Sequence, residues 1–252
     1  MKKIVAIVQA RMGSKRLPGK VLQRIMGETL LGHIIDRISK SKFINGNIIL
    51  ATTSNPSDQI IVDFANEKHL DCFAGSEDDV LDRFYQAAKL ADADIIVRIT
   101  ADDPFKDPEI MDEIIKIMID GDFDYVSNTI EPTYPEGLDI EVFSFDSLEK
   151  AWKEAKKSSE REHVTPYIWN HPAIFNLYNV KNKEDLSSMR WTVDTDKDFE
   201  FARAVYERLY VPGKIFLMND ILTILKNEPD LQKINAGIER SAGYQKSLRE
   251  DP

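Results

Sequence analysis

The chain has little of what extracellular, membrane-spanning or disordered proteins need. It holds a single cysteine, Cys72, among 252 residues, which excludes a disulfide framework and a cysteine-based zinc site. No apolar run approaches the roughly 20 residues of a membrane span, and the apolar run at residues 4–8 is too short for a signal peptide. Glycine and proline, 11 of each, are too few for a disordered chain. We expect a globular, cytoplasmic protein with no membrane partner.

Positive charge is also in short supply, except in one place. Lysine and arginine total 33 against 43 aspartates and glutamates, a net charge of −10, which disfavours nonspecific binding to nucleic acid. The first 27 residues nevertheless carry seven lysines and arginines and no acid before Glu28. An acidic protein that gathers its cations in one early segment is expected to form a local anion site there.

Apolar patterning over the first 120 residues alternates between strands and helices. Short β-branched runs indicate buried strands, and apolar residues spaced near 3.6 indicate amphipathic helices. We expect strands at 4–8, 47–53, 71–73 and 94–100, and helices at 30–40, 56–69, 78–91 and 108–119. Strand, loop and helix repeated four times predict an α/β fold with a largely parallel sheet, whose ligand binds at the carboxyl ends of the strands.

The pattern is looser after residue 120. We expect strands at 124–127, 139–143 and 174–180, helices at 145–155, 160–169 and 196–209, and two small helices with a polar tail from about 213. The chain shows no internal repeat, low-complexity tract or clear linker. A single domain, 1–252, is therefore predicted.

The loop after the first predicted strand has the composition of a polyphosphate site. Gly13 and Gly19 let backbone N–H groups turn toward oxygen atoms, and the loop adds cations and the hydroxyl of Ser14. It matches neither G-x-x-x-x-G-K-[ST] nor G-x-G-x-x-G, so a P-loop NTPase and a dinucleotide dehydrogenase are poorly supported. A solvated basic surface loop is the alternative, but the position after the first strand of an α/β sheet favours an anion site.

This loop, Q-A-R-M-G-S-K-R-L-P-G-K at residues 9–20, resembles the first motif of the cytidylyltransferases that activate acidic sugars. The resemblance is to the spore coat polysaccharide biosynthesis protein F-like branch, which is similar to the CMP-Kdo and CMP-acylneuraminate synthetases. Further segments resemble that branch in order: G-S-E-D-D-V-L-D-R at 75–83, R-I-T-A-D-D-P at 98–104, Y-P-E-G-L-D-I-E-V at 134–142, R-E-H-V-T-P-Y at 161–167 and R-W-T-V-D-T at 190–195.

The resemblance implies a three-layer, Rossmann-like nucleotidyltransferase fold of the glycosyltransferase-A type. Residues 1–120 would form its nucleotide-binding half, 121–210 its acceptor-sugar and dimerisation half, and 211–252 a helical tail. The first motif would hold the triphosphate of CTP, with Arg11, Arg16 and Lys20 in catalytic roles. The implied nucleotide-binding residues are Ala10, Arg11, Gly13, Ser14, Lys15, Arg16, Lys20, Ser76, Asp79, Arg83 and Thr100.

Two aspartates are the expected magnesium ligands. Asp102 follows the strand at 94–100, and Mg²⁺ prefers one or two carboxylates together with phosphate oxygens and water. The family usually has Gly-Asp-Cys-Pro here, whereas this chain has Ala101 and Asp103 around Asp102. Either Asp102 or Asp103 therefore remains a possible ligand, and a helix cap before Pro104 is the alternative role that suits Asp103.

Asp194 is the second metal ligand that the resemblance implies. It follows Trp191-Thr192-Val193, which we expect to be an apolar strand, and Asp196 is the expected cap of the next helix.

The acceptor side is expected from residues 134–141 and 161–163. Asp139 and Glu141 share one face of a predicted strand, although a half-exposed strand would show the same pattern. Arg161 near His163 would suit the carboxylate or phosphate of an acceptor, although a lone histidine is more often structural. The expected acceptor residues are Tyr134, Glu136, Asp139, Glu141, Arg161 and His163.

The resemblance implies a magnesium-dependent transfer of CMP from CTP to an acidic sugar or a sugar phosphate, with release of pyrophosphate, in polysaccharide or glycan biosynthesis. It also implies a homodimer formed through residues near 130–180. Two alternatives stay open. Asp194-Thr195-Asp196 could serve as the D-x-D of a metal-dependent glycosyltransferase, although that chemistry needs no dense triphosphate loop. The second alternative is a module that binds CTP without turning it over. That the nucleotide is CTP is implied by the resemblance alone.

Overall fold

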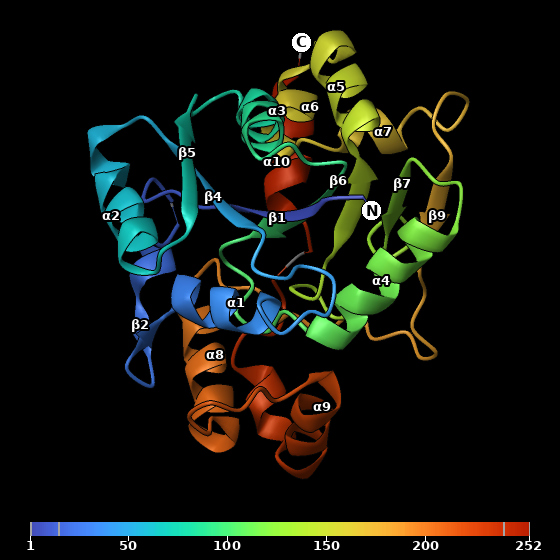
Figure 1. Cartoon of the computed structure of the whole chain (residues 1–252). Coiled ribbons are helices and arrows are strands. Elements are labelled where there is room, and N and C mark those ends of the chain that lie inside the picture. The colour runs from blue at the N-terminus through green and yellow to red at the C-terminus, as the bar shows by residue number, and fades with distance from the viewer. Residues whose placement is uncertain (1, 15, 239, 252) are drawn as a thin grey trace.

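The computed structural model describes residues 2–14, 16–238 and 240–251 and shows a central sheet with helices on both faces (Figure 1). The strands run in the order β5-β4-β1-β6-β8-β7-β9. Their bounds are β1 Ile4–Gln9, β4 Ile48–Thr53, β5 Asp71–Gly75, β6 Ile95–Thr100, β7 Tyr125–Ser127, β8 Glu141–Ser144 and β9 Leu177–Asn179, with a separate hairpin of β2 Arg24–Ile25 and β3 Glu28–Thr29.

Most strands of the main sheet are parallel, as the sequence predicts. β1 pairs in parallel with β4 and β6, and β4 with β5. β8 is antiparallel to both β6 and β7, while β9 is parallel to β7. The carboxyl ends of β1 and β6 therefore meet at one edge, where Gln9 lies opposite Thr100. The predicted α/β class is confirmed.

Ten α-helices are present in the described part of the chain. They are α1 Leu30–Ile38, α2 Gln59–Glu67, α3 Val80–Leu90, α4 Pro108–Asp120, α5 Phe145–Glu154, α6 Ser158–His163, α7 Pro166–Trp169, α8 Asp196–Leu209, α9 Met218–Asn227 and α10 Ala242–Glu250. Short 3-10 turns lie at Lys20–Leu22, Pro56–Asp58 and Pro229–Lys233.

Two apolar cores separate the helices by sheet face. Because successive strand residues point to opposite faces, Ile4, Ala6 and Val8 of β1 belong to one core and Val5 and Ile7 to the other. The first core packs against α1, α2, α4, α8 and α9, and the second against α3, α5 and α7. The sheet is buried on both sides, which explains the nearly continuous apolar runs of its parallel strands.

Two local predictions of secondary structure are wrong. The helix expected at 160–169 divides into α6 and α7, because Val164 takes a φ of +73° and Pro166 has no N–H to continue the helical hydrogen bonds. Residues 191–193 form no strand and follow an isolated bridge between Glu136 and Arg190.

The expected helix caps also differ. Thr195, not Asp196, caps α8 by accepting the Asp198 N–H at 3.3 Å. No helix begins at Pro104, so Asp103 caps none; α4 starts at Pro108, and Asp107 accepts the N–H groups of its first turn.

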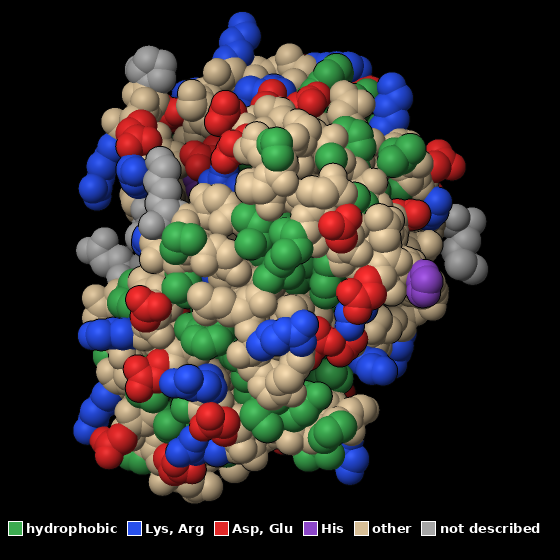
Figure 2. Space-filling view, turned by 90° about the vertical axis from the view of Figure 1, so that its left-hand side faces the viewer, with side chains coloured by type: hydrophobic (Ala, Val, Ile, Leu, Met, Phe, Trp, Pro, Cys, Tyr) green, Lys and Arg blue, Asp and Glu red, His purple; other side chains and the backbone are tan. Residues whose placement is uncertain are grey.

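The molecular surface has a mixed character. On the face that carries α2 and β5, positive and negative side chains are interspersed among apolar ones (Figure 2). None of the described helices combines the length and apolar character that crossing a bilayer requires.

Candidate active site

A cavity of about 600 Å³ opens at the carboxyl ends of β1 and β6. This is the edge at which open α/β sheets bind their ligands, and the size is typical of small-molecule sites. Its walls come from the β1 end and the loop after it, the β6 end, α3, α6, α10 and Asp194. The lining residues are Gln9, Ala10, Arg11, Ser14, Arg16, Lys20, Val21, Val80, Arg83, Thr100, Ala101, Asp102, Glu162, His163, Asp194, Gly243, Lys246, Ser247 and Glu250.

Hydrogen bonds donated by its backbone hold the loop after β1 in shape. The Met12 N–H donates to a carboxylate oxygen of Asp58 at 2.7 Å, and the Gly19 N–H donates to the Met12 carbonyl at 3.1 Å. Gly19 has a φ of +68°, a conformation that favours glycine. The turn at Gly19 leads directly into the 3-10 turn that begins at Lys20, so the lysine is buried at the floor of the cavity.

Lys20 joins the two aspartates that the sequence singles out. Its Nζ lies 2.7 Å from Asp102 Oδ2 and 2.7 Å from Asp194 Oδ1. Burial opposes the charge on Lys20, but the two carboxylates outweigh it and raise the pKa of the ammonium. Burial likewise opposes ionisation of Asp102, and the Lys20 charge outweighs it, so the pKa of Asp102 falls to about 2. Lys20 and Asp102 are therefore both charged at neutral pH.

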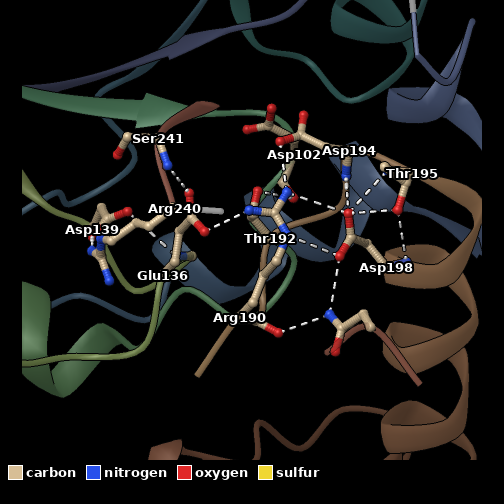
Figure 3. A network of polar contacts seen from close by, with 12 residues as sticks. Asp102, Glu136, Asp139, Arg190, Thr192, Asp194, Thr195, Asp198, Arg240 and Ser241 are labelled. Carbon is tan, nitrogen blue, oxygen red and sulfur yellow. Dashed lines mark hydrogen bonds and ion pairs between the residues drawn. The ribbon is translucent and has the colours of Figure 1, made fainter. Parts of the chain in front are cut away.

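Asp194 is held by two more cations. Arg16 Nη2 lies 2.9 Å from its Oδ2, and Arg190 Nη2 donates to the same oxygen at 2.9 Å. Arg190 also contacts Glu136 at 2.5 Å and Asp198 at 3.0 Å (Figure 3). Asp198 in turn accepts the N–H of Asp194 at 3.1 Å. Both the side chain and the backbone of Asp194 are thereby oriented.

Asp102, and not its neighbour Asp103, faces the cavity. Asp103 is buried, and its Oδ2 accepts from Thr100 Oγ1 at 2.6 Å and from Lys106 Nζ at 2.8 Å. Of the two aspartates that the sequence offers as magnesium ligands, Asp102 lines the cavity and Asp103 does not.

The donor set suits a hard cation such as Mg²⁺. Asp102 and Asp194 converge on one ammonium, so their oxygens lie close together on the cavity wall. Within the described ranges, no three His, Cys, Asp or Glu side chains are grouped to hold a metal ion by themselves. Two carboxylates that leave further positions to phosphate oxygens and water are the coordination that Mg²⁺ favours.

Arg83 supplies a buried cation with unused donors. It is 2% exposed, its Nη1 donates to the Ser76 carbonyl, and its Nε has no hydrogen-bond partner in the described part of the chain. Burial, followed by repulsion from Arg11, lowers the pKa of Arg83 to about 10. Since buried donors are rarely left unpaired, this guanidinium suits a ligand rich in oxygen.

The predicted nucleotide residues mostly meet in this cavity. Ala10, Arg11, Ser14, Arg16, Lys20, Arg83 and Thr100 line it, together with the expected metal ligands Asp102 and Asp194. Gly13, Ser76 and Asp79 do not line it, and Asp79 instead caps α3 by accepting the Asp82 N–H at 2.9 Å. Lys15 lies outside the described residues.

The expected acceptor residues are largely used elsewhere, and only His163 lines the cavity. The Glu141 carboxylate is buried and accepts from Arg98, Thr165 and, at 2.7 Å, the Tyr125 hydroxyl. Arg161 lies 2.6 Å from Asp79.

The other predicted acceptor residues contact the C-terminal segment. Arg240 bonds to Asp139 and donates to the Tyr134 carbonyl at 3.0 Å, while Glu136 accepts the Ser241 N–H at 2.8 Å. These residues are therefore not part of the cavity lining, and neither are Glu141 and Arg161.

Several lining residues were missed in the sequence. Gln9 has a buried Oε1 without a partner among the described residues, and it could have been noted as the last residue of β1. Glu162 lies beside the predicted His163. Gly243, Lys246, Ser247 and Glu250 belong to α10, a stretch that reads as a polar tail and gives no signal of a site.

The fold and the cationic cradle facing two carboxylates define a nucleotidyltransferase. A family model described as cytidylyltransferase matches residues 5–221, and the chain belongs to this family. The resemblance seen in the motifs is thereby confirmed.

Relatives cover nearly the whole chain. It is 33% identical over 250 residues to the spore coat polysaccharide biosynthesis protein SpsF of Bacillus subtilis (strain 168), covering 96% of this chain and 100% of SpsF. It is 40% identical to the uncharacterized protein MJ1063 of Methanocaldococcus jannaschii, with 98% of each chain covered.

Solved structures agree on the fold. A cytidylyltransferase from Leptospira borgpetersenii matches with a TM-score of 0.89 at 31% identity, over 95% of this chain and 100% of that one. A CMP:2-keto-3-deoxy-manno-octonic acid synthetase complexed with CTP matches with a TM-score of 0.64 at 18% identity, over 82% of this chain and 100% of that one, which bears on the fold alone.

Proposed function

We propose that this nucleotidyltransferase is magnesium-dependent and transfers CMP from CTP to an acidic sugar or a sugar phosphate, with release of pyrophosphate. The observation that carries the proposal is the arrangement of Arg16 and Lys20 against Asp102 and Asp194 in one cavity. Family membership and the SpsF relative support a sugar acceptor and a place in polysaccharide or glycan biosynthesis. Relatives named 3-deoxy-manno-octulosonate cytidylyltransferase, 31% identical over 46% of this chain in one case, support CTP and an acidic sugar.

In the proposed reaction, an acceptor oxygen attacks the α-phosphorus of CTP; it is a phosphate oxygen or a hydroxyl oxygen whose proton passes to solvent. A new P–O bond forms, and the bond from the α-phosphorus to the pyrophosphate oxygen breaks. Arg11, Arg16 and Lys20 bind the β- and γ-phosphates and stabilise the charge that develops on the leaving pyrophosphate. The Ser14 hydroxyl and the Arg83 guanidinium provide further donors on the same wall. Transfer of this kind depends on positioning and charge neutralisation, without a covalent nucleophile.

Asp102 and Asp194 are the residues that would hold Mg²⁺. When bound, the ion would neutralise charge on the phosphate oxygens. In the structure, Lys20 and Arg16 pair with these carboxylates. The same two cations have phosphate oxygens as alternative partners, so nucleotide binding would leave both carboxylates available to the metal.

The experiment that tests this function is an assay of pyrophosphate release from CTP with a panel of acidic sugars and sugar phosphates. We expect release with at least one acceptor, dependent on Mg²⁺ and abolished by EDTA. Sugar transfer from a nucleotide sugar, with no pyrophosphate released from CTP, would contradict the proposal and favour a glycosyltransferase. The D-x-D alternative is weakened by the structure, because Thr195 caps α8 and Asp196 does not line the cavity.

We also propose that the protein forms a homodimer through the part of the sheet that ends at β9. Exposed apolar side chains gather near this edge in the sequence segment 130–178, where Ile130, Ile174 and Tyr178 are 37%, 47% and 43% exposed. β9 is the last strand of the sheet, and an unpaired edge with apolar neighbours favours association.

A further inference from the structure

The cavity has a second side that the proposed nucleotide cradle does not use. Glu162 and His163 of α6 and four residues of α10 form it. α10 packs against α6, and Figure 1 shows it beside α6, well away from α9, which precedes it in the chain. This helix lies beyond residues 5–221, the range matched by the family model.

Hydrogen bonds hold α10 against α6. The Ser247 hydroxyl donates to Glu162 at 2.7 Å and lies 3.0 Å from His163 Nε2. Just after the helix, Asp251 accepts the Ser159 N–H at 2.8 Å. α10 is therefore a built wall of the cavity.

The start of α10 is tied to the network around Asp194. Ser241 donates its N–H to Glu136 at 2.8 Å, and Glu136 pairs with Arg190, which contacts Asp194 (Figure 3). Asn235, shortly before the helix, donates to Asp198 at 3.0 Å. The wall and the proposed metal ligand thus share one set of buried contacts, which fixes their relative position.

Among the described residues on this second side of the cavity, Lys246 is the one with a cationic side chain. Its Nζ lies 3.6 Å from Glu250, and the lysine side chain is 63% exposed. Burial, followed by repulsion from Arg98, lowers the pKa of His163 to about 4, so the imidazole is neutral at pH 7. The other described cations of the cavity, Arg11, Arg16, Lys20 and Arg83, come from the loop after β1 and from α3.

We propose that the wall formed by α6 and α10 is the acceptor subsite, and that Lys246 binds the anionic group of the acceptor sugar. The inference rests on the proposed function, because an oxygen that attacks the α-phosphorus must enter the same cavity as CTP. The carboxylates of Glu162 and Glu250 accept hydrogen bonds only, so they suit the hydroxyl groups of a sugar. Lys246 is then a specificity-determining residue that acts on the acceptor and not on the nucleotide.

The test uses three hexoses that differ in one group: D-glucuronate, D-glucose 6-phosphate and D-glucose. The full chain, labelled with ¹⁵N, is first saturated with Mg²⁺ and a CTP analogue whose α- and β-phosphorus atoms are joined by a methylene group, so that no transfer occurs. Each sugar is then titrated while the amide signals of α6 and α10 are followed. The variants are Lys246→Met and Lys246→Arg, with Arg249→Met as a matched control that removes a charge from the same helix outside the cavity lining.

We expect an anionic sugar to shift the amide signals of residues 162–163 and 243–247. Lys246→Met should weaken its binding by about tenfold, the loss typical of one charge-assisted hydrogen bond. Lys246→Arg should restore most of it, Arg249→Met should leave it unchanged, and D-glucose should bind all variants alike. The tighter of the two anionic probes identifies the group as carboxylate or phosphate. We expect D-glucuronate to bind more tightly, because the carboxylates of Glu162 and Glu250 would repel a phosphate dianion more strongly.

Two results would overturn the inference: no shift at α6 and α10 with any sugar, or equal losses in Lys246→Met and Arg249→Met. Failure of the nucleotide analogue to bind in the first step is a separate result, which overturns the proposed function and the inference together.

Discussion

At the residue scale, the proposed transfer depends on the charges around Lys20. Replacing Lys20 by Met should lower kcat/KM by about 10²- to 10³-fold, because one preorganised electrostatic donor is lost. The matched control is Lys68→Met, since Lys68 also pairs with a carboxylate at 2.8 Å but lies outside the cavity lining. Pyrophosphate-release kinetics of both variants check this prediction, and equal losses in the two would contradict it.

Substitutions of Asp102 and Asp103 should likewise have different effects. Asp102→Asn is expected to remove the Mg²⁺ dependence of CTP binding, measured by calorimetry with and without the metal. Asp103→Asn should retain it and instead lower the melting temperature, because Lys106 loses its buried partner at 2.8 Å. A reversed pattern would assign the metal to Asp103.

His163 predicts a pH dependence of stability. Its pKa is about 4 in the folded protein, lowered first by burial and then by Arg98, against 6.5 ordinarily. The unfolded chain therefore binds the proton more readily, and the contribution to stability that is present above pH 6.5 is lost as the pH falls toward 4. Urea unfolding of the wild type and of His163→Gln should show a smaller loss between these pH values in the variant. Parallel curves would show that His163 titrates normally.

The sequence reveals those site residues that lie close together in the chain. Arg11, Ser14, Arg16 and Lys20 lie in one loop, so their proximity follows from the chain itself. Glu136 reads as equally polar, yet it pairs with Arg190, 54 positions further on. Such a partner becomes visible only when the tertiary structure brings distant segments together.

At the element scale, strands and helices with strong apolar periodicity were predictable almost to the residue. The expected helix at 196–209 is α8, Asp196–Leu209, and the expected strand at 94–100 is β6, Ile95–Thr100. The predictions fail where the local signal is weak or conflicting, as at Val164 and at residues 191–193. α10 reads as a polar tail in the sequence, and its contacts with α6 include the bond from Ser247 to Glu162 and the ring of Tyr244 against His163.

The cap of α8 gives a prediction of its own. Thr195 accepts the Asp198 N–H, so Thr195→Ala should destabilise the protein by about 1 kcal/mol. Asp196→Ala, one residue along, removes an exposed side chain that does not cap the helix, and the expected change stays within about 0.5 kcal/mol. Chemical denaturation of both variants measures the difference. A larger loss of stability in Asp196→Ala than in Thr195→Ala would show that Asp196 caps α8, as the sequence predicts.

At the scale of the whole molecule, the sheet brings together segments that are far apart in the chain. Asp194 reaches the Lys20 ammonium from a segment that is not a strand. Lys20, which follows β1, and Asp102, which follows β6, come together because parallel strands end at one edge of the sheet. This convergence was predictable from the α/β pattern. The contribution of α10 was not, because it depends on how the C-terminal segment returns over residues 134–141 to reach α6.

The proposed dimer is tested at this scale as well. Tyr178→Lys places a charge on the exposed edge strand β9 and should shift the protein to a monomer in light scattering coupled to gel filtration. Val211→Lys, which replaces a side chain 48% exposed outside the segment 130–180, is the control and should leave the mass unchanged. A monomeric wild type, or equal effects of both variants, would contradict the proposed interface.

We propose above all that the cavity binds a triphosphate with its magnesium ion. Arg16 and Lys20 would contact the phosphates, and Asp102 and Asp194 would hold the metal. Thermal unfolding in the presence of CTP, ATP, GTP or UTP, each with Mg²⁺ or with EDTA, measures this binding most directly, since a ligand at about 100 times its Kd stabilises the fold by about 2.7 kcal/mol. We expect the largest rise in melting temperature with CTP and Mg²⁺, and the loss of most of that rise with EDTA. A melting temperature that no nucleotide raises, or that CTP raises equally without the metal, would contradict the proposal.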